Sequence, residues 1–268
     1  MVRVSRSALF LLVYLIYLVL FMGFVQRFIL VPLAWVFPVL TDRILVRWSR
    51  LQASVPIALL RSMAGVRISV EGAIGPENRV VIMNHQSLID IVLAVWLVPG
   101  NLTLIPARRR YQWGIPGISV YLRLARYPVI SQTREGIRGD LKMMANAAER
   151  ARRGEATLVI FPEGHRTKDG SILPFMTRGL RLVLSRAPLP VYCIVGDGMW
   201  HARTLVDSMA GLASTHVRLR VIGPFQPPQA ESELPGFIES LRERMIATLE
   251  DMRSAVRPGS PVPLRDAV

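Results

Sequence analysis

The sequence predicts an α/β fold, a mostly parallel central sheet flanked by helices, with a membrane-embedded helical hairpin at the N-terminus. Short apolar runs typical of buried strands alternate with helical patterns after about residue 66, which indicates a parallel sheet. Two uncharged apolar runs before residue 45 predict the hairpin. We therefore expect three parts: the hairpin at 1–45, an α/β domain at 46–255 and a proline-rich, disordered tail at 256–268.

The first apolar run covers residues 8–25 and contains no charged residue. As an α-helix it rises about 27 Å, close to the thickness of the hydrocarbon core of a bilayer. A cleaved signal peptide is the alternative, because Arg3 and Arg6 form a basic segment ahead of the run. The run is long for a signal peptide and no A-x-A-like cleavage site follows it, so we expect a retained anchor.

The second apolar run, residues 28–40, contains Pro32 and Pro38, each of which breaks or kinks a helix. This run either returns through the bilayer or lies along its surface. Arginines flank both ends of the pair of runs: Arg3, Arg6, Arg43, Arg47 and Arg50. Because positive charge stays on the cytoplasmic side of a membrane, a hairpin with both ends inside is favoured over a single crossing.

The formal net charge of the chain is +14, and almost all of its basic residues are arginines. Such a charge suits nucleic acid, an anionic membrane surface or an acidic partner. The sequence has no nucleic-acid-binding motif, so we expect an anionic membrane and no nucleic acid; compositional bias is the alternative explanation. The single cysteine, Cys193, lies in an apolar run and is expected to be a buried, inert thiol.

The remaining elements follow from hydrophobic periodicity and from glycine and proline breaks. Residues 47–62 form an amphipathic helical pattern interrupted by Pro56, and further helices are predicted at 88–97, 114–124, 136–153, 177–186 and 233–253. Apolar or β-branched runs predict strands at 66–70, 79–83, 102–105, 128–131, 157–161 and 191–195. Residues 217–222 alternate apolar residues with arginines, which indicates a half-exposed strand or an edge strand.

Polar clusters follow two of these strands, at the strand ends where α/β sheets gather ligands. The first cluster, NHQSLID at 84–90, contains His85 and Asp90. Positions five apart on one helix do not share a face, so the pair can meet only if His85 precedes the helix and Asp90 lies in its first turns. Asp90 would then accept the Nδ1–H of the imidazole and leave Nε2 free as a general base.

Three other interpretations of this cluster remain open. Ser87 is a good helix N-cap, or it is the nucleophile of a hydrolase triad, although the G-x-S-x-G elbow is absent. A metal site would need His165 in addition, because one histidine and one aspartate are too few ligands. Finally, His85 and Asp90 could be a satisfied polar pair beneath a loop.

The second cluster, FPEGHRTKDG at 161–170, places Glu163, Gly164 and Arg166 in a turn. An arginine in such a turn can bind a phosphate through two parallel hydrogen bonds. A plain surface turn with a salt bridge is the alternative, and this cluster alone does not decide between the two.

Together these motifs resemble the glycerolipid acyltransferase family, whose typical member is the bacterial lysophosphatidate acyltransferase. NHQSLID fits the family's NHxSxxD motif throughout, and FPEGHRT fits its FPEGTRS motif except at His165 and Thr167. The stretch APLPVYCIV at 187–195 resembles the fourth motif, so the resemblance covers roughly residues 55–200. The second motif departs, because arginines replace lysines within residues 107–134 and Arg134 is the candidate for a displaced family arginine.

The resemblance implies direct acyl transfer. His85, oriented by Asp90, would deprotonate the free hydroxyl of a lysophospholipid, 1-acylglycerol-3-phosphate, which would attack the thioester of acyl-CoA or acyl carrier protein. The product would be phosphatidate, made at the cytoplasmic side of a bacterial inner membrane. The positive charge of the chain would favour both the bilayer and the acidic carrier protein.

The resemblance also implies that Glu163, Gly164 and Arg166 hold the polar head of the acceptor, with Arg126 or Arg134 as helpers. No metal and no cofactor are expected. The departure in the second motif keeps another acceptor open, such as a lyso-ornithine lipid or another lysophospholipid. An inactive, membrane-tethered lipid-binding protein is the alternative from a different class.

Overall fold

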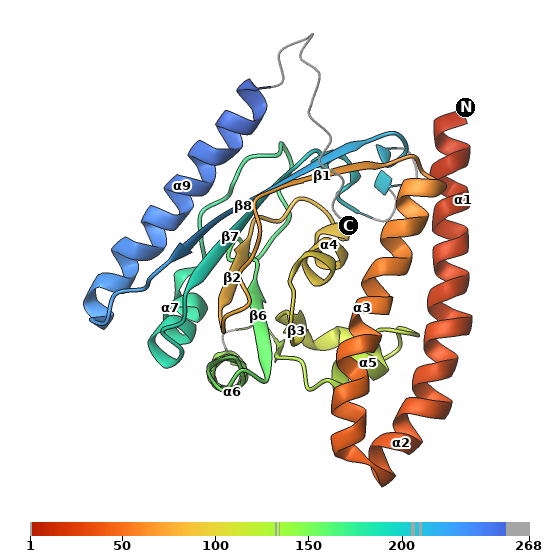
Figure 1. Cartoon of the computed structure of the whole chain (residues 1–268), viewed down its shortest axis with the longest axis horizontal. Coiled ribbons are helices and arrows are strands. Elements are labelled where there is room, and N and C mark those ends of the chain that lie inside the picture. The colour runs from red at the N-terminus through yellow and green to blue at the C-terminus, as the bar shows by residue number, and fades with distance from the viewer. Residues whose placement is uncertain (1, 132, 134, 205–206, 209–210, 256–268) are drawn as a thin grey trace.

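The computed structural model describes residues 2–131, 133, 135–204, 207–208 and 211–255. The predicted disordered tail at 256–268 and the candidate residue Arg134 lie outside the described residues. The described chain forms an α/β domain around a six-stranded sheet, and a helical hairpin packs beside it (Figure 1).

The central sheet contains β1 (Arg67–Glu71), β2 (Val80–Met83), β3 (Leu102–Leu104), β6 (Ala156–Ile160), β7 (Val191–Asp197) and β8 (His216–Phe225). Their order across the sheet is β1-β8-β7-β2-β6-β3, and every neighbouring pair is parallel except β7 with β8. The central strands β2, β6 and β7 are buried along their whole length, which explains their continuous apolar sequences. The predicted α/β fold with a mostly parallel sheet is confirmed.

Helices cover both faces of this sheet (Figure 1). On one side lie α6 (Ile137–Arg152), α7 (Thr177–Arg186) and α9 (Leu234–Ser254); on the other lie α4 (Ile89–Leu97), α5 (Ser119–Leu124) and the hairpin. Three short 3₁₀ helices, η3 (Arg109–Gln112), η4 (Trp200–Ala202) and η5 (Glu231–Glu233), connect the larger elements. The helices predicted for the α/β domain are all present, with the one at 114–124 shortened to α5.

One strand prediction needs correction, and the structure decides between the two alternatives for another strand. The segment predicted at 128–131 forms β5 (Val129–Ile130), which pairs with β4 (Ala107–Arg108) in a separate two-stranded sheet instead of joining the central one. Pro128 has no N–H to donate to a ladder, which keeps this strand short. The strand β8 is not at an edge, because β1 pairs with its outer side; its alternating sequence reflects one half-exposed face.

The N-terminal hairpin forms, but its turn lies elsewhere than predicted. One long helix contains α1 (Val2–Ile16), two π-helical segments, η1 (Tyr17–Gly23) and η2 (Gln26–Leu30), and α2 (Val31–Val36). The second arm, α3 (Pro38–Ser62), returns beside it (Figure 1). The chain therefore turns at Phe37 and not between the two apolar runs, and residue 45 lies inside α3 instead of at its end.

Two prolines explain the position of this turn. Pro32 lies in the first turn of α2, directly after the wide turns of η2, where a missing N–H costs least. Phe37 lies outside the helical region, with φ −133° and ψ 71°, because the following proline disfavours the α conformation, and Pro38 then starts α3. Of the two prolines, only Pro38 breaks the helix.

The long first arm has the properties of a membrane helix. Among the described residues, Ser5–Val36 is the one helix long and apolar enough to cross a membrane, with a mean hydropathy of 2.7. Its outer side exposes large hydrophobic residues, including Phe24, Phe28 and Trp35, which is 87% exposed. An exposed apolar surface of this extent indicates a membrane-associated protein.

Candidate active site

His85 and Asp90 lie at the carboxyl end of β2, in the loop that leads into α4. The Nδ1 atom of His85 is 3.0 Å from Oδ2 of Asp90. The same oxygen accepts hydrogen bonds from the backbone N–H groups of Gln86 (2.5 Å) and Ser87 (2.7 Å), which fix the carboxylate in place. A carboxylate beside Nδ1 favours the proton on that atom, so Nε2 is left as the free acceptor. The structure thus brings together the two residues that the sequence singled out.

The loop of residues 84–90 is joined to the loop that follows β6. The imidazole of His85 stacks on the ring of Phe161, with centroids 4.4 Å apart. The backbone carbonyl of His85 accepts a hydrogen bond from the Thr167 N–H at 2.9 Å. The two polar clusters, far apart in the sequence, therefore form one site.

Glu163 connects the same two loops and is turned away from the predicted ligand position. Its Oε1 accepts the backbone N–H of His85 (2.7 Å), and its Oε2 accepts that of Leu173 (2.8 Å). Glu163 is only 3% exposed to solvent, and its side chain does not line the cavity described below. Burial raises the pKa of Glu163 to about 7, against the opposing effect of the two hydrogen bonds. We assign Glu163 the positioning of His85 instead of contact with the acceptor.

Ser87 does not complete a hydrolase triad in this arrangement. Its hydroxyl donates to the Ala202 carbonyl at 2.6 Å and accepts the Ile89 N–H at 3.3 Å. The side chain is therefore a buried tether that partly caps α4. Cys193 is also buried, and burial raises the pKa of its thiol to about 12, as expected for an inert thiol.

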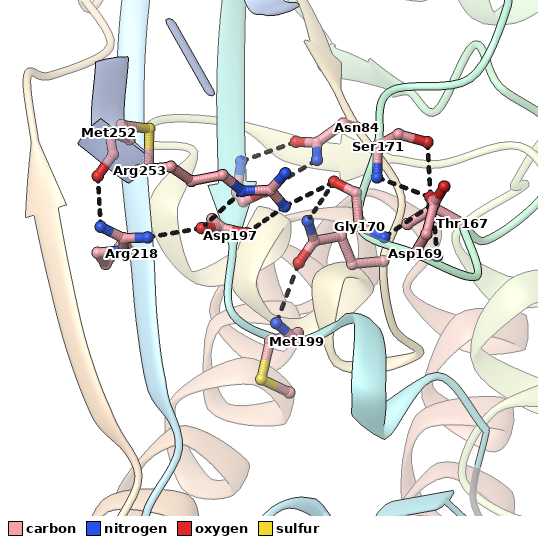
Figure 2. Close-up of polar contacts among 12 residues, drawn as sticks. Asn84, Thr167, Asp169, Gly170, Ser171, Asp197, Met199, Arg218, Met252 and Arg253 are labelled. Atoms are coloured by element: carbon pink, nitrogen blue, oxygen red, sulfur yellow. Dashed lines mark hydrogen bonds and ion pairs between the residues drawn. The ribbon is translucent and has the colours of Figure 1, made fainter. Parts of the chain in front are cut away.

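A hydrogen-bonded network behind the two clusters ties them to β7 and α9 (Figure 2). Asn84 exchanges hydrogen bonds of 2.9 and 2.7 Å with the backbone of Gly196 in β7. Arg253 in α9 pairs with the buried Asp197 (2.8 Å) and donates to the Gly170 carbonyl (2.8 Å). Burial alone would raise the pKa of Asp197, but Arg253 and a second arginine outweigh that effect and lower it. The network fixes both loops relative to the sheet.

A cavity of about 1090 Å³ opens beside His85. Its apolar wall comes from the hairpin and from helices on both sides of the sheet: Tyr14, Leu18, Met22, Val92, Leu122 and Met144. Because the long N-terminal helix supplies part of this wall, an apolar chain in the cavity would lie against the helix that is long and apolar enough to cross a membrane.

Five arginines line the same cavity: Arg108, Arg110, Arg166, Arg178 and Arg203. Within the described part of the chain, none of them forms a salt bridge with a carboxylate. Arg166 donates to the backbone carbonyl of Arg203. Burial lowers the pKa of Arg166, and the positive charges of Arg203 and Arg108 add to that shift. This wall is suited to an anionic group.

The other predicted residues of the site are distributed differently. Gly164 and Arg166 line the cavity, whereas Arg126 does not: it is exposed, and its carbonyl accepts a hydrogen bond from Arg150 at 3.1 Å. Sequence reasoning missed Arg178 and Arg203. Arg203 follows the end of β7, and ligands gather at the ends of strands in α/β sheets, so its position in the sequence was a usable signal. No comparable signal in the sequence marks Arg178.

Comparisons with known proteins identify similar acyltransferases. Residues 67–196 match the model of a family described as Acyltransferase. The chain is 29% identical to the 1-acyl-sn-glycerol-3-phosphate acyltransferase of Cocos nucifera over 164 residues, 60% of this chain and 52% of the coconut protein. The match with the human 1-acyl-sn-glycerol-3-phosphate acyltransferase alpha has 26% identity and covers 75% of this chain and 70% of the relative. The chain thus spans about half the length of the coconut relative.

A solved structure shows the same fold. The chain is similar to the 1-acyl-sn-glycerophosphate acyltransferase PlsC from Thermotoga maritima, with a TM-score of 0.65 and 22% sequence identity. The match covers 92% of this chain and 98% of the solved chain, so it includes the hairpin as well as the α/β domain.

Proposed function

We propose that this chain, of which residues 67–196 match the Acyltransferase family, is a 1-acylglycerol-3-phosphate O-acyltransferase that produces phosphatidate. One observation carries the proposal: His85, paired with Asp90, lines a cavity that combines an apolar lining with arginines that form no salt bridge among the described residues. An anionic head and a long acyl chain are the two features of the acceptor, and the cavity offers a complementary surface for each.

The reaction is a direct acyl transfer. Nε2 of His85 takes the proton of the acceptor's free hydroxyl while the oxygen attacks the thioester carbonyl. The tetrahedral intermediate then expels the thiolate, which takes that proton from the imidazolium to leave as a thiol. Asp90 stabilises the imidazolium between the two steps, because its carboxylate stays within hydrogen-bond distance of Nδ1. No acyl-enzyme forms, so neither Ser87 nor Cys193 needs to act as a nucleophile.

The acceptor phosphate is held by Arg166 with Arg203 and Arg108, whose mutual repulsion a phosphate dianion relieves. The acyl chain of the acceptor lies along Tyr14 and Leu18, on the side of the membrane helix. The hairpin anchors the enzyme in a bacterial inner membrane with the site on the cytoplasmic side. The acyl donor is acyl-CoA or acyl carrier protein.

Another lysolipid is the second candidate acceptor, because the segment 107–134 departs from the family motif. A lyso-ornithine lipid carries an ammonium group beside its one carboxylate, whereas a phosphomonoester offers an arginine-lined wall a doubly charged anion with no attached cation. A phosphomonoester head is therefore the better fit.

Transfer of a labelled acyl group to a panel of lysolipids tests the proposal. The detergent-solubilised chain is supplied with acyl-CoA and, separately, with acyl carrier protein. We expect lysophosphatidate to be acylated fastest. Faster acylation of another lysolipid would overturn the acceptor assignment, and no transfer to any lysolipid would favour the inactive lipid-binding alternative.

Replacing either Arg166 or Arg203 with alanine is expected to raise the KM for the acceptor by about ten-fold or more, because each loses charge-assisted hydrogen bonds to phosphate. The KM for the acyl donor should change less. Steady-state kinetics with each substrate varied in turn measures both constants. Arg126→Ala is the matched control, since Arg126 is exposed and outside the cavity wall. An effect confined to the donor KM would mean that these arginines bind the other substrate.

A further inference from the structure

A second hollow, of about 480 Å³, lies on the surface next to the cavity. It runs between α7 and the junction of η5 with α9, and its lining is Thr177, Arg178, Arg181, Leu182, Ser185, Glu231 and Leu234. Arg178 lines both the hollow and the cavity. The first turn of α7 therefore separates the site of His85 from an open surface groove.

The start of α7 is fixed close to the reacting pair. The backbone N–H of Met176 donates to the Pro162 carbonyl at 2.7 Å, and Met176 itself lines the cavity. Pro162 precedes Glu163, whose carboxylate holds the backbone of His85. A molecule that reaches from His85 past Met176 thus arrives at Arg178 and the groove.

The groove has a mixed lining that includes two arginines, Arg178 and Arg181. Arg178 and Arg181 are exposed and three residues apart, so they share one face of α7. Neither forms a salt bridge with a carboxylate among the described residues, although Glu231 also lines the groove. The hydroxyl of Thr177 also lines the groove, whereas that of Ser185 donates to the Leu182 carbonyl at 3.2 Å. Two neighbouring arginines without a carboxylate partner suit a phosphate.

We propose that this groove binds the phosphate of the acyl donor's pantetheine arm, the group that acyl-CoA and acyl carrier protein have in common. The inference rests on the proposed function, in which a thioester must reach His85 while the rest of the donor stays outside. It assigns the two substrates to different arginines. Arg166 and Arg203 hold the acceptor phosphate inside the cavity, and Arg178 and Arg181 hold the donor phosphate at its edge.

The test is a double variant, Arg178→Gln with Arg181→Gln, assayed with three donors: acyl-CoA, acyl carrier protein and an acyl-pantetheine that lacks the phosphate. We expect the KM for the first two donors to rise about ten-fold or more, while kcat and the acceptor KM stay within about two-fold. The kcat/KM for acyl-pantetheine should not change. Arg186→Gln, at the far end of α7 and outside the groove, is the matched control.

Each other outcome overturns the inference. An unchanged donor KM would exclude the groove, and an equal loss with acyl-pantetheine would show that the arginines do not act through phosphate. An effect on acyl-CoA but not on acyl carrier protein would assign them to the nucleotide end of CoA. If the unaltered protein acylates no lysolipid with any donor, the proposed function fails instead.

A second measurement avoids altering the protein. Pantetheine 4′-phosphate should inhibit the unaltered enzyme in competition with the acyl donor and not with the acceptor. Pantetheine itself should inhibit at least about ten-fold less strongly, because it lacks the charged group. Equal inhibition by the two compounds would contradict a phosphate site in the groove.

Discussion

Replacing His85 with alanine is expected to lower the rate of acyl transfer by about 10²–10⁴-fold, the range typical for removal of a general base. The protein should remain folded, because the loop is held by bonds that the substitution leaves intact. These are the backbone N–H of His85 to Glu163 and the backbone carbonyl of His85 to Thr167. Turnover of a labelled acyl donor at saturating acceptor, beside a thermal melt in detergent, measures both properties.

His165→Ala is the matched control for this variant. His165 also lines the cavity, but it is exposed and has no carboxylate partner among the described residues. It should keep most of the activity. Retention of more than about a tenth of the activity by the His85 variant would contradict the base assignment, and loss in the His165 variant would move the base to that residue.

The second large effect is expected at Glu163. Its carboxylate accepts two backbone N–H groups, whereas a glutamine amide has only one oxygen. Glu163→Gln therefore leaves one buried N–H without an acceptor, which costs about 1–3 kcal/mol. The same change displaces the backbone of His85, so we expect kcat to fall more than either KM.

The pH dependence of stability separates Glu163 from other groups. Its pKa is about 7 in the folded protein and 4.5 when unperturbed, so folding favours the protonated form. The stabilisation is fully present below pH about 4.5 and is lost as the pH rises through about 7, a change of about 3 kcal/mol. The stability advantage of the unaltered protein over the Glu163→Gln variant should shrink across this window.

Melting curves of the two proteins in detergent from pH 4.5 to pH 8 test that expectation. Glu250→Gln, an exposed position on α9, is the control and should follow the unaltered protein throughout. Parallel curves for the unaltered protein and the Glu163 variant would mean that Glu163 titrates as an ordinary carboxylate.

The order of the elements and the pairing of His85 with Asp90 were predictable from the sequence because both depend on local patterns. Buried parallel strands need continuous apolar runs, and amphipathic helices need apolar residues that recur every three to four positions. His85 and Asp90 are close along the chain, so a strand followed by a helix suffices to bring them together. The membrane helix follows from the same logic, since the length of an uncharged run is a property of the sequence alone.

The turn of the hairpin and the role of Glu163 required the structure. Pro32 and Pro38 look alike in the sequence, but Pro32 falls within the first turn of α2, whereas Pro38 follows Phe37, which is not helical. The motif containing Glu163 predicts contact with the substrate. Its actual partners are backbone N–H groups of two separate segments, and no residue pattern reveals which way a carboxylate points.

The sequence by itself determined the α/β fold, the long apolar helix and the pairing of His85 with Asp90, because each rests on residues close to one another along the chain. Only the tertiary structure decided which arginines surround that pair. Arg108, Arg166, Arg178 and Arg203 come from separate loops and a helix, and the parallel sheet brings them to one cavity. The arginines of the chain have the same side chain, so the sequence does not distinguish them. They differ in their position relative to His85.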